Sequence, residues 1–137
     1  MTMSEWLKRK TGRHGERMPV GATSVEALLV ALRDGDPAAR RQAAIALGDV
    51  GDSRATGDLI RSLDDRDDVV RVEAVIALGK IGDARAVEHL IAKLKSQDYL
   101  YVRKKAAYTL YVFLKQERLD PGLREKILSH WRSWYLT

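Results

Sequence analysis

The sequence predicts an all-α fold, a short α-solenoid built from repeated pairs of helices. The main observation is an internal repeat: residues 34–64 and 65–95 align at an offset of 31 with 15 identities. Each copy carries two segments with the apolar spacing of a helix, and helix pairs that bury their faces against one another stack into solenoids. The 137 residues also include only three prolines and one phenylalanine, which is unlike an all-β fold.

The alignment divides the chain into a basic segment, a half unit, two full units and a divergent last unit, over residues 1–22, 23–33, 34–64, 65–95 and 96–137. The last four parts are predicted to form one repeat domain, residues 23–137. The basic segment is predicted to contain at most one short helix. At the start of the half unit, Thr23 and Glu26 have the spacing of a capping box, which predicts the beginning of a helix.

Each full unit is predicted to open with a helix that is capped by an aspartate. Asp36 and Asp67 precede these helices, where a carboxylate accepts the unpaired backbone N–H groups. Pro37 occupies the first helical position, where a missing N–H group costs nothing. One face is apolar in both copies, at positions 39, 43, 46, 47 and 50 and at positions 70, 74, 77, 78 and 81.

A glycine and an aspartate mark the turn inside each full unit. Gly51 and Gly82 are predicted to adopt a left-handed conformation, and Asp52 and Asp83 to cap the following helix. The second helices then carry apolar stripes of Ala55, Leu59, Ile60 and Leu63, and of Ala86, Leu90, Ile91 and Leu94.

The last unit departs from the pattern but keeps two helices. Asp98 is predicted to cap a helix over residues 99–115, and Asp120 precedes Pro121 at the start of the final helix. Leu123, Ile127 and Trp131 fall at the core positions of this final helix.

The two full units share the pattern R-x-x-A-x-x-A-L-G-x-(I/V)-G-D-x-R-A-x-x-x-L-I-x-x-L, which occurs in part twice more within residues 23–135. This pattern resembles HEAT-like repeats of the phycobilisome-lyase type. The resemblance implies a short right-handed α-solenoid of HEAT-like two-helix repeats. It says little about function, because the family includes scaffolds, chromophore lyases and metal-dependent hydroxylases.

Arginine recurs at one position of every unit, as Arg40, Arg71 and Arg103. We expect these arginines to form a ladder in which each pairs with an aspartate of a neighbouring layer, Asp52 or Asp83. The same is expected of Arg54 and Arg85. The alternative is a basic stripe that binds an anion.

Several classes of function find no support in the sequence. The absence of cysteine excludes disulfides, thiolate metal sites and cysteine nucleophiles. The di-iron hydroxylases of the resembling family carry paired His-Glu motifs, whereas this chain has only the reversed Glu88-His89, and His89 is expected to be exposed. We therefore predict no metal, no cofactor and no enzymatic activity. Short apolar runs and the absence of a signal-like start predict no membrane span and a cytoplasmic protein.

Charge is distributed unevenly along the chain. Residues 1–17 carry +3 and residues 96–137 carry +4, whereas residues 34–68 carry −4. Two basic ends fit nucleic acid, a ribosome surface or an acidic protein. Any binding to nucleic acid is expected to be weak, since no motif that reads bases is present.

Aromatic residues gather in the last unit, which holds eight of the nine. Helical spacing places several of them on one face with flanking cations. The candidate partner-binding surface is Lys104, Tyr108, Tyr111, Lys115, Arg132 and Trp134. Two alternatives remain open: a self-contained cap closed by Trp134 and Tyr135, and a homodimer through this layer. A different partner face is the second-helix surface of Arg61, His89 and Lys93.

The repeats and the aromatic layer together predict a non-catalytic protein–protein interaction module. It would serve as a small HEAT-repeat adaptor, accessory subunit or assembly chaperone that binds a larger protein. The alternative is a nucleic-acid- or ribosome-associated factor. A weaker alternative, implied by the family resemblance, is a bilin-lyase-like protein that handles a tetrapyrrole.

Overall fold

The computed structural model describes residues 24–136, without the side chains of residues 135 and 136. The predictions for residues 1–22 and for the side chain of Tyr135 lie outside this described part. Its elements are seven α-helices and two short 3-10 helices: α2 (Val25–Asp34), α3 (Pro37–Val50), η1 (Ser53–Ala55), α4 (Thr56–Ser62), α5 (Asp68–Ile81), η2 (Ala84–Ala86), α6 (Val87–Leu94), α7 (Leu100–Leu114) and α8 (Pro121–Leu136).

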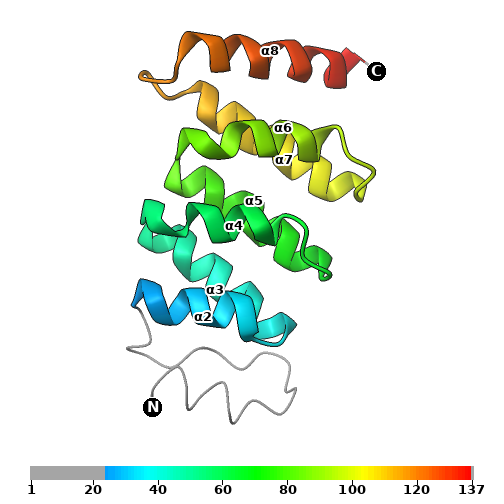
Figure 1. The fold of residues 1–137 in the computed structure, drawn as a ribbon. Helices are drawn as coiled ribbons and strands as arrows, with labels where there is room; N and C mark the ends of the chain where they lie inside the picture. Colours follow the sequence, from blue (N-terminus) through cyan, green and yellow to red (C-terminus); the bar gives the residue numbers. More distant parts are fainter. Residues whose placement is uncertain (1–23, 137) are drawn as a thin grey trace.

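The helices stack in layers along one axis, from α2 to α8 (Figure 1). Helices α2, α4, α6 and α8 lie on one side of the stack, and α3, α5 and α7 lie behind them (Figure 1). Helix α5 packs between α3 and α7, and α7 also packs against α6. This arrangement confirms the predicted all-α fold, a short α-solenoid.

Short polar side chains begin the helices as the sequence predicts, with two corrections. Asp36 accepts a hydrogen bond from the N–H of Ala39, and Asp67 caps α5 in the same way. In the half unit, the side chain that caps α2 is that of Ser24, which accepts a hydrogen bond from the N–H of Ala27, and Thr23 lies outside the described residues. Asp98 does not cap α7, because Tyr99 occupies the N-cap position and Asp98 is held by basic side chains.

Glycine is required at the turn inside each full unit. Gly51 and Gly82 end α3 and α5 with φ of 74° and 72°, in the left-handed region that glycine alone adopts without strain. Asp52 and Asp83 then cap 3-10 turns that lead into α4 and α6. The sequence predicted both features.

A second pair of glycines sets the distance between layers. A Cβ atom on Gly48 would lie 2.9 Å from the Cα of Ala77, and one on Gly79 would lie 2.8 Å from Thr109. Glycine at these positions therefore lets α3 approach α5, and α5 approach α7. The equivalent residue of α7 is Tyr111, whose ring stacks on that of Trp131 in α8.

The arginine ladder exists, but with different aspartates from those predicted. Arg40 donates two hydrogen bonds to Asp65, of 2.9 and 3.0 Å, and one to the carbonyl of Gly35. Arg71 binds Asp98 in the same two-pronged manner, at 2.9 and 2.8 Å. Asp52 and Asp83 are therefore not the ladder partners of these arginines. The actual partners lie in the loops that open the next layer.

The remaining repeated arginines also depart from the prediction. Arg54 and Arg85 bind Asp52 and Asp83, each two residues earlier in its own turn, so these pairs do not join layers. A second contact of each arginine joins the layers instead. Arg54 pairs with Glu26 at 3.0 Å, and Arg85 donates to the backbone carbonyl of Ser53 at 3.2 Å. Within residues 24–136, Arg103 donates to the backbone carbonyl of Asp98 and to no carboxylate.

The hydrophobic core runs through the whole stack between the two rows of helices. Every layer contributes large apolar side chains that are fully buried, among them Leu28, Leu47, Leu59, Leu78, Leu90, Leu94, Leu110, Phe113 and Ile127. Burial of these side chains provides most of the free energy that orders the layers.

We predict that Leu78→Ala lowers the free energy of unfolding by about 2–5 kcal/mol, because the cavity left by a buried leucine does not close. Leu78 has 0% of its surface exposed, whereas Leu100 has 51%. The control Leu100→Ala should lower it by less than about 0.5 kcal/mol. Urea denaturation of both variants measures this, and equal losses would contradict the assignment of Leu78 to the core.

A second prediction concerns acid stability. The hydrogen bond from Arg85 lowers the pKa of Asp83 from its ordinary 3.8 to about 2. A carboxylate whose pKa is lower in the folded than in the unfolded state stabilises the fold fully at a pH above its unfolded pKa. This stabilisation is lost as the pH falls through the folded pKa. Asp83→Asn should therefore destabilise the protein at about pH 6, with a difference from wild type that shrinks between about pH 4 and pH 2. Urea denaturation across this range measures it; a constant difference would contradict the linkage.

Candidate functional site

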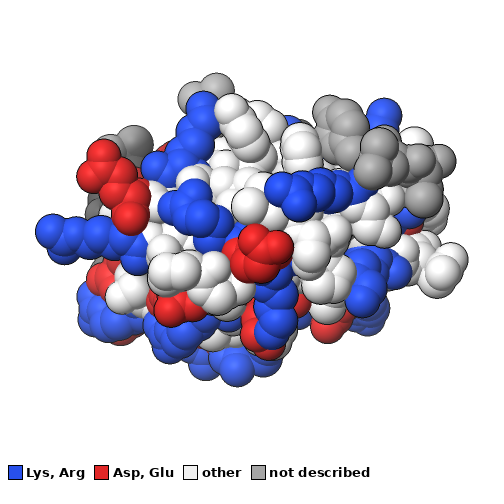
Figure 2. Space-filling view, turned by 90° about the horizontal axis from the view of Figure 1, so that it is seen from above, with Lys and Arg blue, Asp and Glu red and all other residues white. Residues whose placement is uncertain are grey.

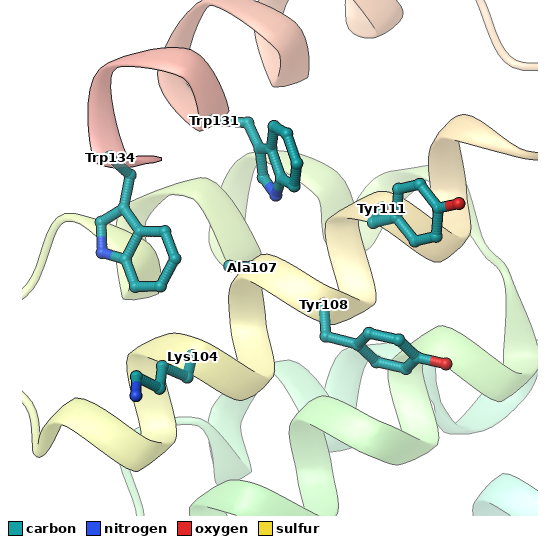
Figure 3. A pocket seen from close by; sticks show the side chains of 6 residues that line it. All are labelled: Lys104, Ala107, Tyr108, Tyr111, Trp131 and Trp134. Carbon is teal, nitrogen blue, oxygen red and sulfur yellow. The ribbon is translucent and has the colours of Figure 1, made fainter. Parts of the chain in front are cut away.

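A hollow of about 520 Å³ lies between α7 and α8. We name it the C-terminal groove and define it by its lining residues, Lys104, Ala107, Tyr108, Tyr111, Trp131 and Trp134. Figure 3 shows both indole rings projecting from α8 toward α7, with the ring of Tyr111 beside that of Trp131.

Helical spacing explains why these side chains meet. Lys104, Tyr108 and Tyr111 follow one another at intervals of four and three residues, so they share one face of α7. Trp131 and Trp134 are three residues apart and share one face of α8. The groove forms where the two faces meet.

The rings in the groove hold one another in place. Tyr111 stacks on Trp131 with 6.4 Å between ring centroids and an angle of 23° between the rings. The ring centroids of Tyr108 and Tyr111 are 6.4 Å apart, and the two rings are tilted by 41°. Lys115 adds a cation–π contact, with its Nζ atom 4.7 Å from the centre of the Tyr111 ring.

The groove also touches the core. Trp131 and Trp134 are half-buried and pack against the core cluster, and Ile127 below them is fully buried. Tyr108 and Tyr111 are 62% and 40% exposed. The two tryptophans thus form the half-buried side of the groove, and the two tyrosines form its exposed side.

The structure brings four of the six predicted partner-binding residues into this groove: Lys104, Tyr108, Tyr111 and Trp134. Lys115 joins through its contact with Tyr111, whereas Arg132 is exposed and does not line the groove. Ala107 was not predicted to line a site, and Trp131 was predicted to belong to the core alone. The spacing of Trp131 and Trp134 could have indicated their common face.

The cations around the groove have no acidic partner among the residues that the structure describes. Within residues 24–136, neither Lys104, Lys115 nor Arg132 forms an ion pair. Helix α7 carries three basic residues and no acidic one. Figure 2, which looks onto the α8 end, shows Lys and Arg side chains spread around patches of uncharged surface.

A smaller hollow of about 240 Å³ adjoins Tyr108 on its other side, between α5 and α7. Ile76, Thr109 and Val112 contribute to its lining. Here the cations have acidic neighbours: Lys80 pairs with Asp49 at 2.7 Å. Burial raises the pKa of the nearby Glu73, although the charges of Lys80 and Lys105 oppose the shift.

The alternative partner face is also hollowed. Arg61, His89 and Lys93 line a hollow of about 290 Å³. His89 is exposed, as predicted, but the two cations are engaged: Lys93 binds Asp98 at 3.1 Å and Arg61 pairs with Asp58. This face therefore presents fewer free charges than the C-terminal groove.

Neither a metal cluster nor a membrane span is found in the described part of the chain. Among residues 24–136, no three His, Asp or Glu side chains are grouped so that they could hold a metal ion. None of the helices in that range combines the length and hydropathy that crossing a bilayer requires.

Comparison with known families assigns the repeats. The family model for HEAT repeats matches residues 25–111, from α2 into α7. This chain belongs to the HEAT repeat family. HEAT repeats commonly mediate protein–protein interaction, and HEAT-repeat proteins are generally non-catalytic. The match does not extend to α8, and it does not distinguish the phycobilisome-lyase type. No curated protein matches this HEAT-repeat chain.

We predict that a chelator such as EDTA leaves the melting temperature of the full-length protein unchanged. The described fold is explained by apolar layers and by the arginine ladder, which need no metal. Circular dichroism melting curves with and without EDTA, and with Mg²⁺ added back, measure this. A chelator-induced drop that the metal reverses would contradict the prediction and favour the hydroxylase type.

Proposed function

We propose that this HEAT-repeat chain is a non-catalytic protein–protein interaction module, a small adaptor, accessory subunit or assembly chaperone, and that a larger protein partner docks in the C-terminal groove. The observation that carries the proposal is a hollow of about 520 Å³ lined by four aromatic rings.

The chemistry of the groove supports docking. Aromatic side chains are enriched in protein interfaces, where they provide large contact areas at a small cost in conformational entropy. Tyr108 keeps 62% of its surface exposed, although its repeat equivalents Ile45 and Ile76 are aliphatic. Half-buried Trp131 gives the surface a rigid base, so that less ordering is needed on binding.

We predict that Tyr111→Ala and Trp134→Ala each abolish partner binding while the melting temperature stays within about 5 °C of wild type. An aromatic anchor in such a site contributes about 2 kcal/mol or more to binding. Tyr101→Ala is the matched control, since Tyr101 is 47% exposed and lines neither hollow. Tagged protein recovered from nuclease-treated native lysate, together with melting curves, measures both effects.

Other outcomes of this experiment would overturn the proposal. If both variants unfold, the rings are core, and the partner face is the surface around Arg61, His89 and Lys93. If nuclease removes the bound material, the alternative of a nucleic-acid- or ribosome-associated factor is favoured. If wild type sediments as a dimer that the variants dissociate, the groove is a homodimer interface.

A further inference from the structure

The C-terminal groove combines an aromatic lining with a cation near each end. Lys104 lines one end, and Lys115 lies over Tyr111 at the other. The two lysines are eleven positions apart, which corresponds to about 16 Å along a helix. The nearest acidic residue before α7 is Asp98, and its charge is already neutralised by Arg71 and Lys93. Lys104 and Lys115 are both exposed, and neither forms an ion pair within residues 24–136.

We propose that the occupant of the C-terminal groove is a short acidic segment of a partner protein. A large apolar side chain of this segment lies against Trp131 and Trp134, and its carboxylates face Lys104 and Lys115. This inference rests on the proposed function and adds the chemistry of the partner. Complementary charge carries it, because unpaired cations at the rim attract and orient an anionic partner.

The distance between the two lysines limits the length of the segment. About 16 Å corresponds to five residues of extended chain or to three turns of helix. The acidic residues should therefore lie about four to six positions apart in an extended segment, or about eleven apart in a helical one, with the apolar anchor between them.

The second hollow adds an uncharged anchor point. It shares Tyr108 with the groove, and its cation Lys80 is already paired with Asp49. A segment that continues across Tyr108 toward α5 therefore meets apolar surface from Ile76 and Val112. We expect apolar residues, without added acidic ones, on that side of the segment.

Charge disfavours two other occupants. The chain's own N-terminal residues 1–17 carry a net charge of +3 and would be repelled by the lysines of the groove. A second copy related by two-fold symmetry would bring each basic patch against itself. Like charges that face each other across an interface oppose association.

The rings disfavour single-stranded nucleic acid. Successive bases need free aromatic faces on which to stack. The ring of Tyr111 is already contacted by both Trp131 and Lys115, which leaves Tyr108 as the most exposed ring of the groove. Glu73, close to Lys80 and Lys105, also opposes a phosphate backbone that crosses toward α5.

Selection from a displayed peptide library tests the inference. Random peptides of about twelve residues, long enough for three helical turns, are selected against the full chain. We expect enriched sequences to contain a large apolar residue flanked by Asp or Glu, and their affinity to fall as salt is raised. The double variant Lys104→Glu with Lys115→Glu should bind the best peptide about tenfold more weakly or worse.

Matched controls separate a local effect from a general one. Lys95→Glu makes the same charge change as Lys104→Glu alone, at an exposed position that lines a different hollow beside α6 and α8, and should keep the affinity of wild type. Peptides in which Lys replaces every Asp and Glu should not bind. Melting curves confirm that the variants remain folded, and fluorescence of the tryptophans reports binding in the groove.

Each contrary outcome has a distinct meaning. Uncharged or basic peptides that still require Trp134 would overturn the acidic segment and leave the proposed function standing. Peptides insensitive to Trp134→Ala would overturn both. Failure to enrich any peptide would overturn the short segment, while partner recovery from lysate still decides the proposed function. If oligouridylate displaces the bound peptide and an excess of a different acidic peptide does not, the result would favour nucleic acid as the occupant of the groove.

Discussion

The two arginine–aspartate pairs between successive full layers, Arg40–Asp65 and Arg71–Asp98, are the interaction on which the order of the stack depends. Arg40 and Arg71 each bind one carboxylate of the following junction with two hydrogen bonds, and each also binds a backbone carbonyl. The pairs are largely buried, so loss of one partner would leave a charge that water reaches poorly. Burial opposes ionisation of Asp98, but hydrogen bonds from Arg71 and Lys93 outweigh it and lower its pKa. Apolar packing holds the layers together, and these pairs fix where each layer begins.

The candidate site lies where this repeated arrangement stops. Arg103 occupies the ladder position in α7 but, in the described part of the chain, donates to the backbone carbonyl of Asp98 and to no aspartate side chain. Tyr111 occupies the position at which Gly48 and Gly79 allow close approach of the next layer. A large ring at that position contacts Trp131 and helps to form one wall of the groove. The same departures from the repeat therefore end the regular stack and help to form the C-terminal groove.

Local features of the fold were predictable from the sequence, and distances between helices were not. Capping by Asp36 and the left-handed Gly51 depend on neighbouring residues, so the pattern predicts them correctly. The predicted aspartate partners of the ladder were wrong. The repeat identifies the recurring arginines, but each unit offers several aspartates as partners. Only the packing of the layers determines that Asp65 and Asp98 are the ones bound. Lys104, Tyr108 and Tyr111 could be grouped because one helix carries them. The double role of Trp131 could not be predicted, since it depends on how far α8 stands from α7.

The position of the groove also explains why family membership alone says so little about function here. The HEAT-repeat match ends at Tyr111, whereas Trp131 and Trp134 belong to α8, outside it. The matched residues build the stack, which many unrelated functions share. The groove takes one wall from the last matched helix and the other from a helix that the family pattern does not describe. Because Trp131 packs on the core and lines the groove, an occupant would bury further surface on a base that the repeats already hold rigid. In the proposed function, the repeats would supply the preorganisation on which binding depends, and the aromatic and basic residues of α7 and α8 would supply its specificity.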